Sequence, residues 1–236
     1  MRKALWLFFI VIPLTWADIK VNPIWIKLSP DTPFSSTIIT NKNTAPIVMQ
    51  ASIVPFLPTT QGSSANFSTP LVVSPAVAVI PPNAEQVFRV AYLSTSSTPL
   101  NQEIAQRLLI SDVPSNMPQV GGHVINFIYA FSLPVFVAPH NPVEAFNFSA
   151  VNDGKGNYTF SIHNTGNVHI HLSSLTLSAP GVDSKLLSKQ TEFIMYVLAD
   201  SSVKATLTTQ NPNITSITVT CTLDDGTKQT VTIPVS

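Results

Sequence analysis

Three histidines lie close enough in the sequence to suggest a metal site. His169 and His171 are two residues apart in the segment NVHIHLSSL, so their side chains share a face if this segment is a strand. Together with His163 they would offer the three nitrogen ligands of a zinc site. However, no acidic residue that could orient the rings is evident nearby, and polar alternation on a solvated strand face also explains all three. We therefore expect neither a metal nor any other cofactor.

The neighbouring carboxylates Asp224 and Asp225 are a second candidate for chemistry. They directly precede Gly226, which is typical of a turn rather than of a catalytic pair. Cys221 is the only cysteine, and the alternating segment ITVTCTL around it predicts a buried structural thiol without a disulfide partner. The chain also lacks the motifs of serine, metal or phosphate-loop catalysis. We therefore do not expect an enzyme.

The charge content restricts the partners of the protein. Only 10% of the 236 residues are charged and the formal net charge is zero, whereas charged residues make up roughly 25% of a typical domain. The sequence has no basic stripe, so nucleic acid is not an expected partner. Its 20 prolines, combined with so few charges, favour strands and turns over helices.

Residues 1–17 have the pattern of a secretory signal peptide. Two basic residues precede an apolar run from Ala4 to Leu14, and the small residue Ala17 follows at the expected cleavage position. The apolar run is shorter than the roughly 20 residues that span a membrane. We therefore expect an exported chain that begins at Asp18 and has no membrane span.

Alternating segments separated by Pro, Asn, Ser and Gly indicate strands along the whole exported chain. Those of the first half are Ile19–Leu28, Ser35–Thr40, Ile47–Val54, Leu71–Ile80, Gln86–Leu93, Arg107–Ile110 and Val124–Val137. Those of the second half are Val143–Val151, Tyr158–Asn164, His169–Ser178, Phe193–Leu198, Ser202–Thr208, Ser216–Leu223 and Gln229–Val235. The stiff segment APHNP separates the halves. We predict an all-β fold of two immunoglobulin-like β-sandwich domains, residues 18–139 and 140–236.

The segment GGHVINFIYAFSLPVFVAP, residues 121–139, contains the longest predicted strand. From Ile125 onward every second residue is large and apolar, so these side chains share one face. The predicted strand of residues 124–137 exceeds the usual length of about five or six residues. A strand needs only one apolar face to close its own core. The additional length suits a strand of which a part serves the core of another protein.

Five segments, in order along the exported chain, resemble those of a known family. They are DIKVNPIWIKLSP, STIITNKNTAPIVMQASI, LVVSPAVAVIPPNAEQVFRV, RLLISDVP and the long strand. The third segment is the most specific, because Pro75, Pro81, Gln86 and Arg89 match the family pattern. On this basis the chain resembles the periplasmic pilus-assembly chaperones of the PapD-like superfamily.

The resemblance implies a defined activity. Such chaperones are boomerang-shaped pairs of immunoglobulin-like domains that act in the periplasm without ATP or metal. A pilus subunit is an incomplete sandwich, and the chaperone fills its groove with alternate side chains of the seventh strand of its first domain, the donor strand. The complex then docks at an outer-membrane usher. The expected partners are therefore pilus (fimbrial) subunits and the usher.

The resemblance places the donor side chains at Ile125, Phe127, Tyr129 and Phe131. Each apolar side chain of this size contributes roughly 1.5–3 kcal/mol when it is fully buried. The alternative interpretation is that all four are ordinary core residues of the first domain.

The cationic anchor of the family is not at its usual positions. In the better-known members two basic residues bind the terminal carboxylate of the subunit, and the matching positions here are Pro134 and the uncharged segment Pro23–Trp25. A desolvated carboxylate still needs compensation, which a guanidinium supplies with two hydrogen bonds. We expect Arg89 to be the first candidate for the anchor and Lys27 the second. The alternative for Arg89 is a structural role at the rim of the first domain.

The ionic contacts that join the two domains of this family are also incomplete. Asp112 and Asp224 match its acidic interdomain positions, but Ala138 stands where the arginine is expected. The segment SLPVF, residues 132–136, resembles a stretch that is frequent in the archaic or alternative branch, and the short connection Val113–Gly122 argues against the long-loop branch of the family. These departures indicate the archaic or alternative branch of the family.

A second class of function is also compatible with the sequence. A secreted adhesin or binding module of two immunoglobulin-like domains would bind through the loops at one end of a sandwich. A chaperone would instead expose an apolar edge strand, which is normally an aggregation hazard. Such an edge would also permit a self-capping dimer of the free protein.

Overall fold

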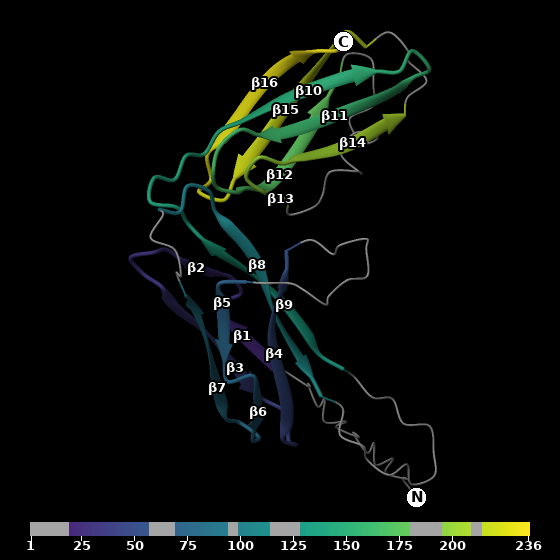
Figure 1. The fold of residues 1–236 in the computed structure, drawn as a ribbon. Helices are drawn as coiled ribbons and strands as arrows, with labels where there is room; N and C mark the ends of the chain where they lie inside the picture. Colours follow the sequence, from purple (N-terminus) through teal and green to yellow (C-terminus); the bar gives the residue numbers. More distant parts are fainter. Residues whose placement is uncertain (1–18, 57–68, 94–98, 114–127, 180–194, 209–213) are drawn as a thin grey trace, which may run out of the picture.

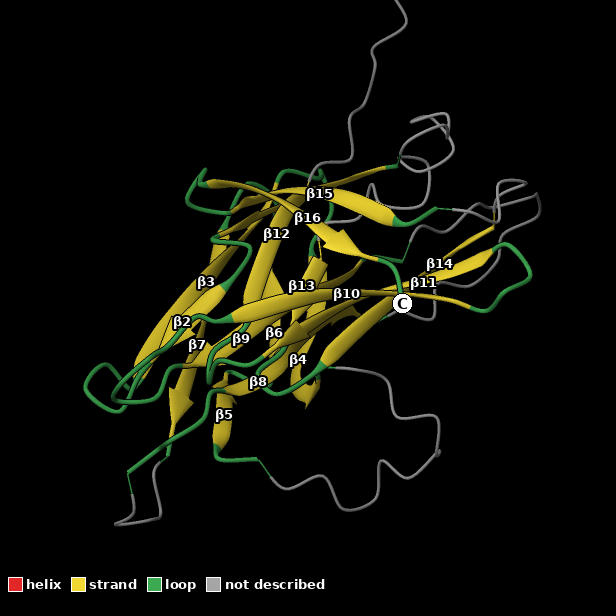
Figure 2. Ribbon diagram, turned by 90° about the horizontal axis from the view of Figure 1, so that it is seen from above, coloured by secondary structure: helices red, strands yellow, loops and turns green. Residues whose placement is uncertain are grey.

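The computed structural model describes residues 19–56, 69–93, 99–113, 128–179, 195–208 and 214–236. Strands and connecting turns build two sandwiches that meet end to end at an angle (Figure 1). Figure 2 shows no helix in the described part of the chain. The predicted all-β fold is confirmed, whereas the predicted signal peptide lies outside the described residues.

The first sandwich packs a four-stranded sheet, β1-β3-β7-β5, on a five-stranded sheet, β2-β9-β8-β4-β6. The described pairs are antiparallel except β2 with β9, which run parallel. The strands are β1 (Ile19–Asn22), β2 (Ile26–Leu28), β3 (Phe34–Asn41), β4 (Ile47–Pro55), β5 (Leu71–Ser74), β6 (Val77–Ile80), β7 (Glu85–Tyr92), β8 (Ile104–Asp112) and β9 (Ala130–Val137).

Two of the predicted strands are each divided between the two sheets. The predicted strand of residues 19–28 forms β1 and β2, which Pro23 separates, and that of residues 71–80 forms β5 and β6, which Pro75 separates. Proline has no N–H to contribute to a ladder, so each strand is interrupted there and the chain crosses to the opposite sheet. The first crossing brings β2 alongside the last residues of β9.

The second sandwich packs a three-stranded sheet, β10-β11-β14, on a four-stranded sheet, β13-β12-β15-β16. The strands are β10 (Phe146–Asn152), β11 (Asn157–Asn164), β12 (Ile170–Ser178), β13 (Met195–Val197), β14 (Ser202–Thr208), β15 (Ser216–Leu223) and β16 (Lys228–Pro234). Short-range alternation in the sequence therefore located the strands of this half to within a few residues.

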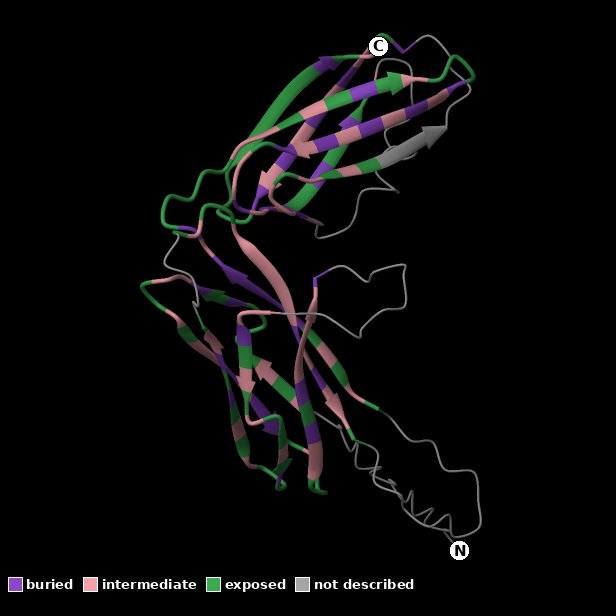
Figure 3. Cartoon of the chain, in the orientation of Figure 1, coloured by how far each residue is buried: buried purple, intermediate pink, exposed green. Residues whose placement is uncertain are grey.

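Each sandwich has its own apolar core. In the first, Phe88 and Leu108 are buried with Leu133, Val135 and Val137 of β9. In the second, the buried residues include Phe160, Leu172, Val219 and Cys221. Figure 3 shows how buried and less buried positions alternate along β11 and β15, as expected for strands that face a core on one side only. The predicted burial of the Cys221 thiol is confirmed, and burial raises its pKa.

Candidate functional site

One edge of the five-stranded sheet is open along most of β9. Strand β8 pairs with the whole of β9, whereas β2 covers only residues 135–137 on the other side. Among the described residues, the segment from Ile128 to Pro134 therefore has no neighbouring strand on that side. A strand edge of this kind is a template for pairing with another chain. We refer to residues 128–134 as the open edge.

Alternate residues of the open edge present their backbone groups to the unpaired side. The N–H of Asp112 donates to the carbonyl oxygen of Tyr129 (2.8 Å), so the odd-numbered residues bond to β8. The even-numbered residues, including Ala130 and Ser132, therefore direct their N–H and C=O groups outward. Pro134 has no N–H, so the row of donors ends there.

The predicted donor residues lie only partly within the described chain. Ile125 and Phe127 are outside it. Tyr129 and Phe131 are half-buried against the core of the first sandwich, and their rings stack with a centroid distance of 6.4 Å. The next residue on this face, Leu133, is fully buried. In the free chain, Tyr129 and Phe131 thus form the margin of its own core.

A guanidinium group lies beside the point where the open edge ends. Arg107 on β8 is the direct partner of Pro134 in the ladder. Its Nε donates to the carbonyl oxygen of Phe56 (3.0 Å), and its Nη1 donates to the carbonyl and hydroxyl oxygens of Ser132 (3.2 and 3.3 Å). The guanidinium carbon is 4.5 Å from the centroid of the Phe56 ring. Four contacts therefore hold this cation at the end of the edge.

Lys27 supplies a second cation near the same point. It is exposed on β2, where it is the register partner of Phe136 in β9. Its Nζ lies over the ring of Trp25, 4.9 Å from the centroid. Two positive side chains from neighbouring strands thus flank the end of the open edge.

Arg89 lies on the opposite sheet. Its ladder partners are Ser36 and Ser74, and it is exposed between the buried residues Phe88 and Val90 of β7. Its side chain therefore points away from the core on the outer face of the four-stranded sheet, and the whole sandwich separates it from the open edge. The structure therefore places Arg89, the first candidate for the carboxylate anchor, away from the open edge.

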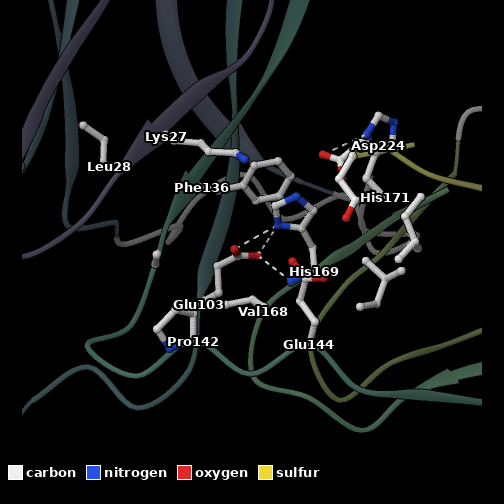
Figure 4. A pocket seen from close by; sticks show the side chains of 14 residues that line it. Lys27, Leu28, Glu103, Phe136, Pro142, Glu144, Val168, His169, His171 and Asp224 are labelled. Atoms are coloured by element: carbon white, nitrogen blue, oxygen red, sulfur yellow. Dashed lines mark hydrogen bonds and ion pairs between the residues drawn. The ribbon is translucent and has the colours of Figure 1, made fainter. Parts of the chain in front are cut away.

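A cavity of about 420 Å³ lies between the two sandwiches (Figure 4). Both sandwiches contribute ionisable side chains to its lining. These are Lys27, Glu103, Glu144, His169, His171, Asp224 and Asp225.

The strongest contact across this junction joins Glu103 to His169. Glu103 directly precedes β8, and only 4% of its side chain is exposed. Both of its carboxylate oxygens lie 2.9 Å from Nδ1 of His169, and one of them also accepts the backbone N–H of His169 (3.1 Å). Figure 4 shows this pair among the side chains that line the cavity. A nearly buried carboxylate is thus compensated by one imidazole from the other sandwich.

Asn167 adds neutral hydrogen bonds to the same junction. Its Nδ2 donates to the carbonyl oxygens of Asn101 and Asn141 (2.9 Å each), and its Oδ1 accepts the N–H of Val143 (2.7 Å). Its backbone carbonyl accepts the N–H of Glu103 (2.9 Å). One asparagine therefore ties the loop before β8 and the connection between the sandwiches to the β11–β12 loop.

Five rings pack together beside these polar contacts. The His169 ring stacks on Phe136 with a centroid distance of 3.6 Å, and the His171 ring stacks on Tyr196 at 4.3 Å. Phe56 contacts both Phe136 and Tyr196, at 5.6 and 5.8 Å. Burial raises the pKa of Tyr196, while the positive charge of Arg107 acts in the opposite direction. The rings extend the junction toward Arg107 and the open edge.

His171 is the histidine whose protonation this environment opposes. Burial lowers its pKa; the Asp224 carboxylate partly offsets this effect, and His169 reinforces it. Its Nδ1 is 3.8 Å from Asp224, an ion-pair distance that is too long for a good hydrogen bond. Its Nε2 is buried and has no hydrogen-bond partner among the described residues. The neutral imidazole therefore suits this position.

The two predicted interdomain carboxylates occupy different regions. Asp224 lines the cavity, but its ion pair is with His171 of the same sandwich. Asp112 is at the far end of β8, where it pairs with Met49, so its predicted contact with the second domain is wrong. Glu103, next to the opposite end of the same strand, makes the contact instead.

The three histidines considered as metal ligands do not form one group. His163 lies on β11 and bonds to Ser202 of β14 (2.9 Å), whereas His169 and His171 lie on or next to β12 in the opposite sheet. No cluster of three His, Cys, Asp or Glu side chains suited to a metal occurs within the described ranges. Nor does that part of the chain contain a helix that is long and apolar enough to cross a membrane.

Sequence reasoning missed Arg107 and Glu103. Arg107 stands in the segment RLLISDVP, which carried the family resemblance, and a correct β8–β9 register would have placed it opposite Pro134. Glu103 and His169 are 66 residues apart and on different sandwiches. No local pattern in the sequence links them.

The described chain thus forms two immunoglobulin-like sandwiches, and an open sheet edge ends beside their junction. The family described as "Pili and flagellar-assembly chaperone, PapD N-terminal domain" matches residues 18–142, more than half of the chain. The chain belongs to this family of pilus-assembly chaperones. A search of the curated proteins found no match.

Solved structures of pilus chaperones share the fold over nearly the whole chain. The YadV chaperone is 15% identical, with a TM-score of 0.65 over 91% of this chain and 98% of its own. The SafB chaperone of Salmonella enterica, solved with the SafA pilin, is 16% identical, with a TM-score of 0.60 over 93% of this chain and 97% of the matched chain. The third is the CsuC–CsuE chaperone–tip adhesion subunit complex of the archaic Csu pili of Acinetobacter baumannii. The matched chain is 18% identical, with a TM-score of 0.60 over 93% of this chain and 100% of its own. The two-domain chaperone fold predicted from the sequence is confirmed.

Proposed function

We propose that this protein is a periplasmic chaperone that binds pilus subunits by donating the open edge of β9 to their incomplete sandwiches. The observation that carries the proposal is the edge itself: residues 128–134 have no neighbouring strand in the described chain on the side away from β8, and they end beside Arg107 and Lys27. Membership of the chaperone family supports it. No step of this function requires a covalent bond to be made or broken, and none requires ATP or a metal.

The charges at the junction favour one direction for the partner strand. β9 runs toward the junction, so a strand parallel to it has its C-terminus there and an antiparallel strand has its N-terminus there. Arg107 and Lys27 repel a terminal amine and attract a terminal carboxylate. The partner strand therefore runs parallel to β9 and ends near Pro134, in line with β2, which is also parallel to β9.

Arg107 is the anchor in this proposal, in place of Arg89, and Lys27 assists it. A guanidinium binds a carboxylate through two parallel N–H···O bonds. The Nε and Nη1 of Arg107 are already bonded to Phe56 and Ser132, which fixes its orientation and reduces the entropy lost on binding. The bound subunit thus ends where the row of backbone donors also ends, at Pro134.

The apolar donor side chains provide most of the affinity. Ile125 and Phe127 lie before the described part of β9, and Tyr129 and Phe131 continue their alternation toward the core of the first sandwich. A side chain of this size contributes roughly 1.5–3 kcal/mol when it passes from full exposure to full burial in the groove of a subunit, and Tyr129 and Phe131, which are already half-buried, contribute less. Ladder hydrogen bonds from Ala130 and Ser132 add affinity that does not depend on the sequence of the subunit.

The proposal also covers the export of the protein, the delivery of its subunit to an usher and its branch of the family. The family match begins at residue 18, which supports cleavage of a signal peptide at 1–17 and export to the periplasm. The exported chain then comprises domains 18–139 and 140–236, and its complex with a subunit docks at an outer-membrane usher. The replacement of the usual basic residues by Pro134 and Ala138 supports a place in the archaic or alternative branch.

Co-expression with a pilin-like subunit from the same genome, followed by co-purification, tests the proposal. Phe127→Asp is expected to abolish the complex, because it places a charge in the apolar groove of the subunit. Phe34→Asp is the matched control, since Phe34 is 69% exposed on the opposite sheet. Circular dichroism verifies that both variants fold. A complex that survives Phe127→Asp would overturn donor-strand binding and favour an adhesin that binds through its loops.

A further inference from the structure

Trp25 is a large apolar side chain that is held in place and yet 46% exposed. The carbonyl oxygen of Pro23, two residues before it, accepts a hydrogen bond from Thr37 Oγ1 (2.8 Å), and the next residue, Ile26, is buried in the core. The Nζ of Lys27 lies over the indole ring. Its exposure therefore does not result from a loose terminus.

The position of Trp25 coincides with the end of the open edge. Ile26 is the register partner of Val135 in the parallel β2–β9 pair, so Trp25, one residue earlier, stands beside Pro134. Because Ile26 and Leu28 face the core, Trp25 and Lys27 face the opposite side of the sheet. A strand added parallel to β9 would meet the start of β2 at this tryptophan.

We propose that Trp25 is a specificity-determining residue whose indole receives the last side chain of the partner strand and favours an apolar, planar one. This inference rests on the proposed function, because it requires a strand that ends at Pro134. It names the chemistry of the partner: a β-strand with a free terminal carboxylate that follows an aromatic or other large apolar residue.

The alternation of side chains between the two faces of the sheet supports this assignment. Partner residues in register with Ser132 or Pro134 direct their side chains to the face of the sheet that carries Trp25 and Lys27. A terminal carboxylate attracted by Lys27 brings the last residue close to the indole, because Nζ is only 4.9 Å from the ring centroid. Contact between an aromatic side chain and the indole then removes exposed apolar surface from water.

The exported chain, residues 18–236, contains Trp25 as its sole tryptophan, because the other two of the sequence are Trp6 and Trp16. Its fluorescence therefore reports on this site alone. The probes are synthetic peptides, acetyl-Thr-Val-Lys-Val-Thr-Val-X, in which X is Phe, Gly or Glu and the C-terminus is a free carboxylate or an amide. Peptide affinities for the wild type, Trp25→Ala and Ile24→Ala are measured by heteronuclear NMR. Ile24 is a suitable control because it is the exposed apolar neighbour of Trp25.

The inference predicts that the Phe peptide with a free carboxylate binds most tightly and shifts the Trp25 emission. Trp25→Ala should weaken this peptide by about three- to tenfold, the range expected for one aromatic pair, and leave the Gly peptide unchanged. Ile24→Ala should leave the affinities of both the Phe peptide and the Gly peptide unchanged. Equal affinities for Phe and Gly, or a preference for Glu, would overturn the role of Trp25 while the edge still binds. Failure of every peptide to bind at the open edge would overturn the proposed function and this inference with it.

Discussion

Arg107 on β8 lies directly opposite Pro134 on β9. This pairing places a guanidinium beside the position where the family resemblance leads one to expect a basic residue on the donor strand. Pro134 ends the row of backbone donors and cannot carry a charge, and the neighbouring strand provides the charge at the same level. In the proposed function this guanidinium serves as the anchor, on the strand next to the donor strand.

Replacement of Arg107 is expected to weaken subunit binding strongly. Arg107→Ala removes the proposed partner of a desolvated carboxylate, and loss of such a partner costs about 2–5 kcal/mol of binding free energy. Arg107→Lys should recover only part of it, because lysine lacks the bidentate fork. Titration calorimetry of each variant with a purified subunit measures the effect.

Arg89→Ala is the matched control for that experiment, since Arg89 is exposed on the far sheet. It should leave the affinity unchanged. An Arg89 variant that weakens binding as much as Arg107→Ala, with both proteins fully folded, would return the anchor to the position that the sequence alone favoured.

The Glu103–His169 bridge should respond asymmetrically to the loss of either partner. His169→Leu leaves the nearly buried Glu103 carboxylate without compensation, and breaking a buried pair in this way costs about 3–5 kcal/mol. Glu103→Gln should cost less, because the amide oxygen still accepts a hydrogen bond from His169. A double-mutant cycle on thermal unfolding gives the coupling energy, and small-angle scattering reports whether the two sandwiches change their relative orientation. Equal effects of the two single variants would contradict the asymmetry.

His171 makes the protein sensitive to acid. Burial lowers its pKa below the ordinary histidine value of 6.5, so the folded state binds fewer protons than the unfolded state in that range. The corresponding stability is fully present above pH 6.5 and is lost as the pH falls through the lowered pKa. His171→Phe preserves a ring to stack on Tyr196 but cannot take up a proton. Its thermal stability should therefore fall less between pH 7 and pH 5 than that of the wild type. His163→Phe, at a half-buried histidine on the opposite sheet of the same sandwich, is the matched control for the loss of a histidine.

The sequence predicted the strands well because their signals are local. Alternation from Gln86 to Leu93 and from Ser216 to Leu223 depends only on neighbouring residues and on a two-sided sheet. The sequence did not predict which elements contact each other in three dimensions. The choice of Arg89 as the anchor and of Asp112 as an interdomain residue both depended on which elements meet. Pro23 shows that one short run can serve two sheets. The contact of Glu103 with His169 required both sandwiches to be placed, which no residue pattern encodes.

Asn41 and Asn164 have equivalent roles in the two sandwiches: each side chain joins the end of its strand to the following loop and to a second strand. This equivalence leads to a last prediction. Each is fully buried at the end of a strand and donates from Nδ2 to the carbonyl oxygen four residues later, Ala45 or Val168. Each also donates to a second strand and accepts, through Oδ1, the N–H two residues later. Removal of either side chain leaves several buried backbone groups unpaired, at a cost of about 1–3 kcal/mol each. Calorimetric unfolding should therefore show that Asn164→Ala strongly destabilises the second sandwich, Asn41→Ala the first, and the exposed Asn147→Ala neither. A small loss for Asn164→Ala would mean that water replaces these hydrogen bonds.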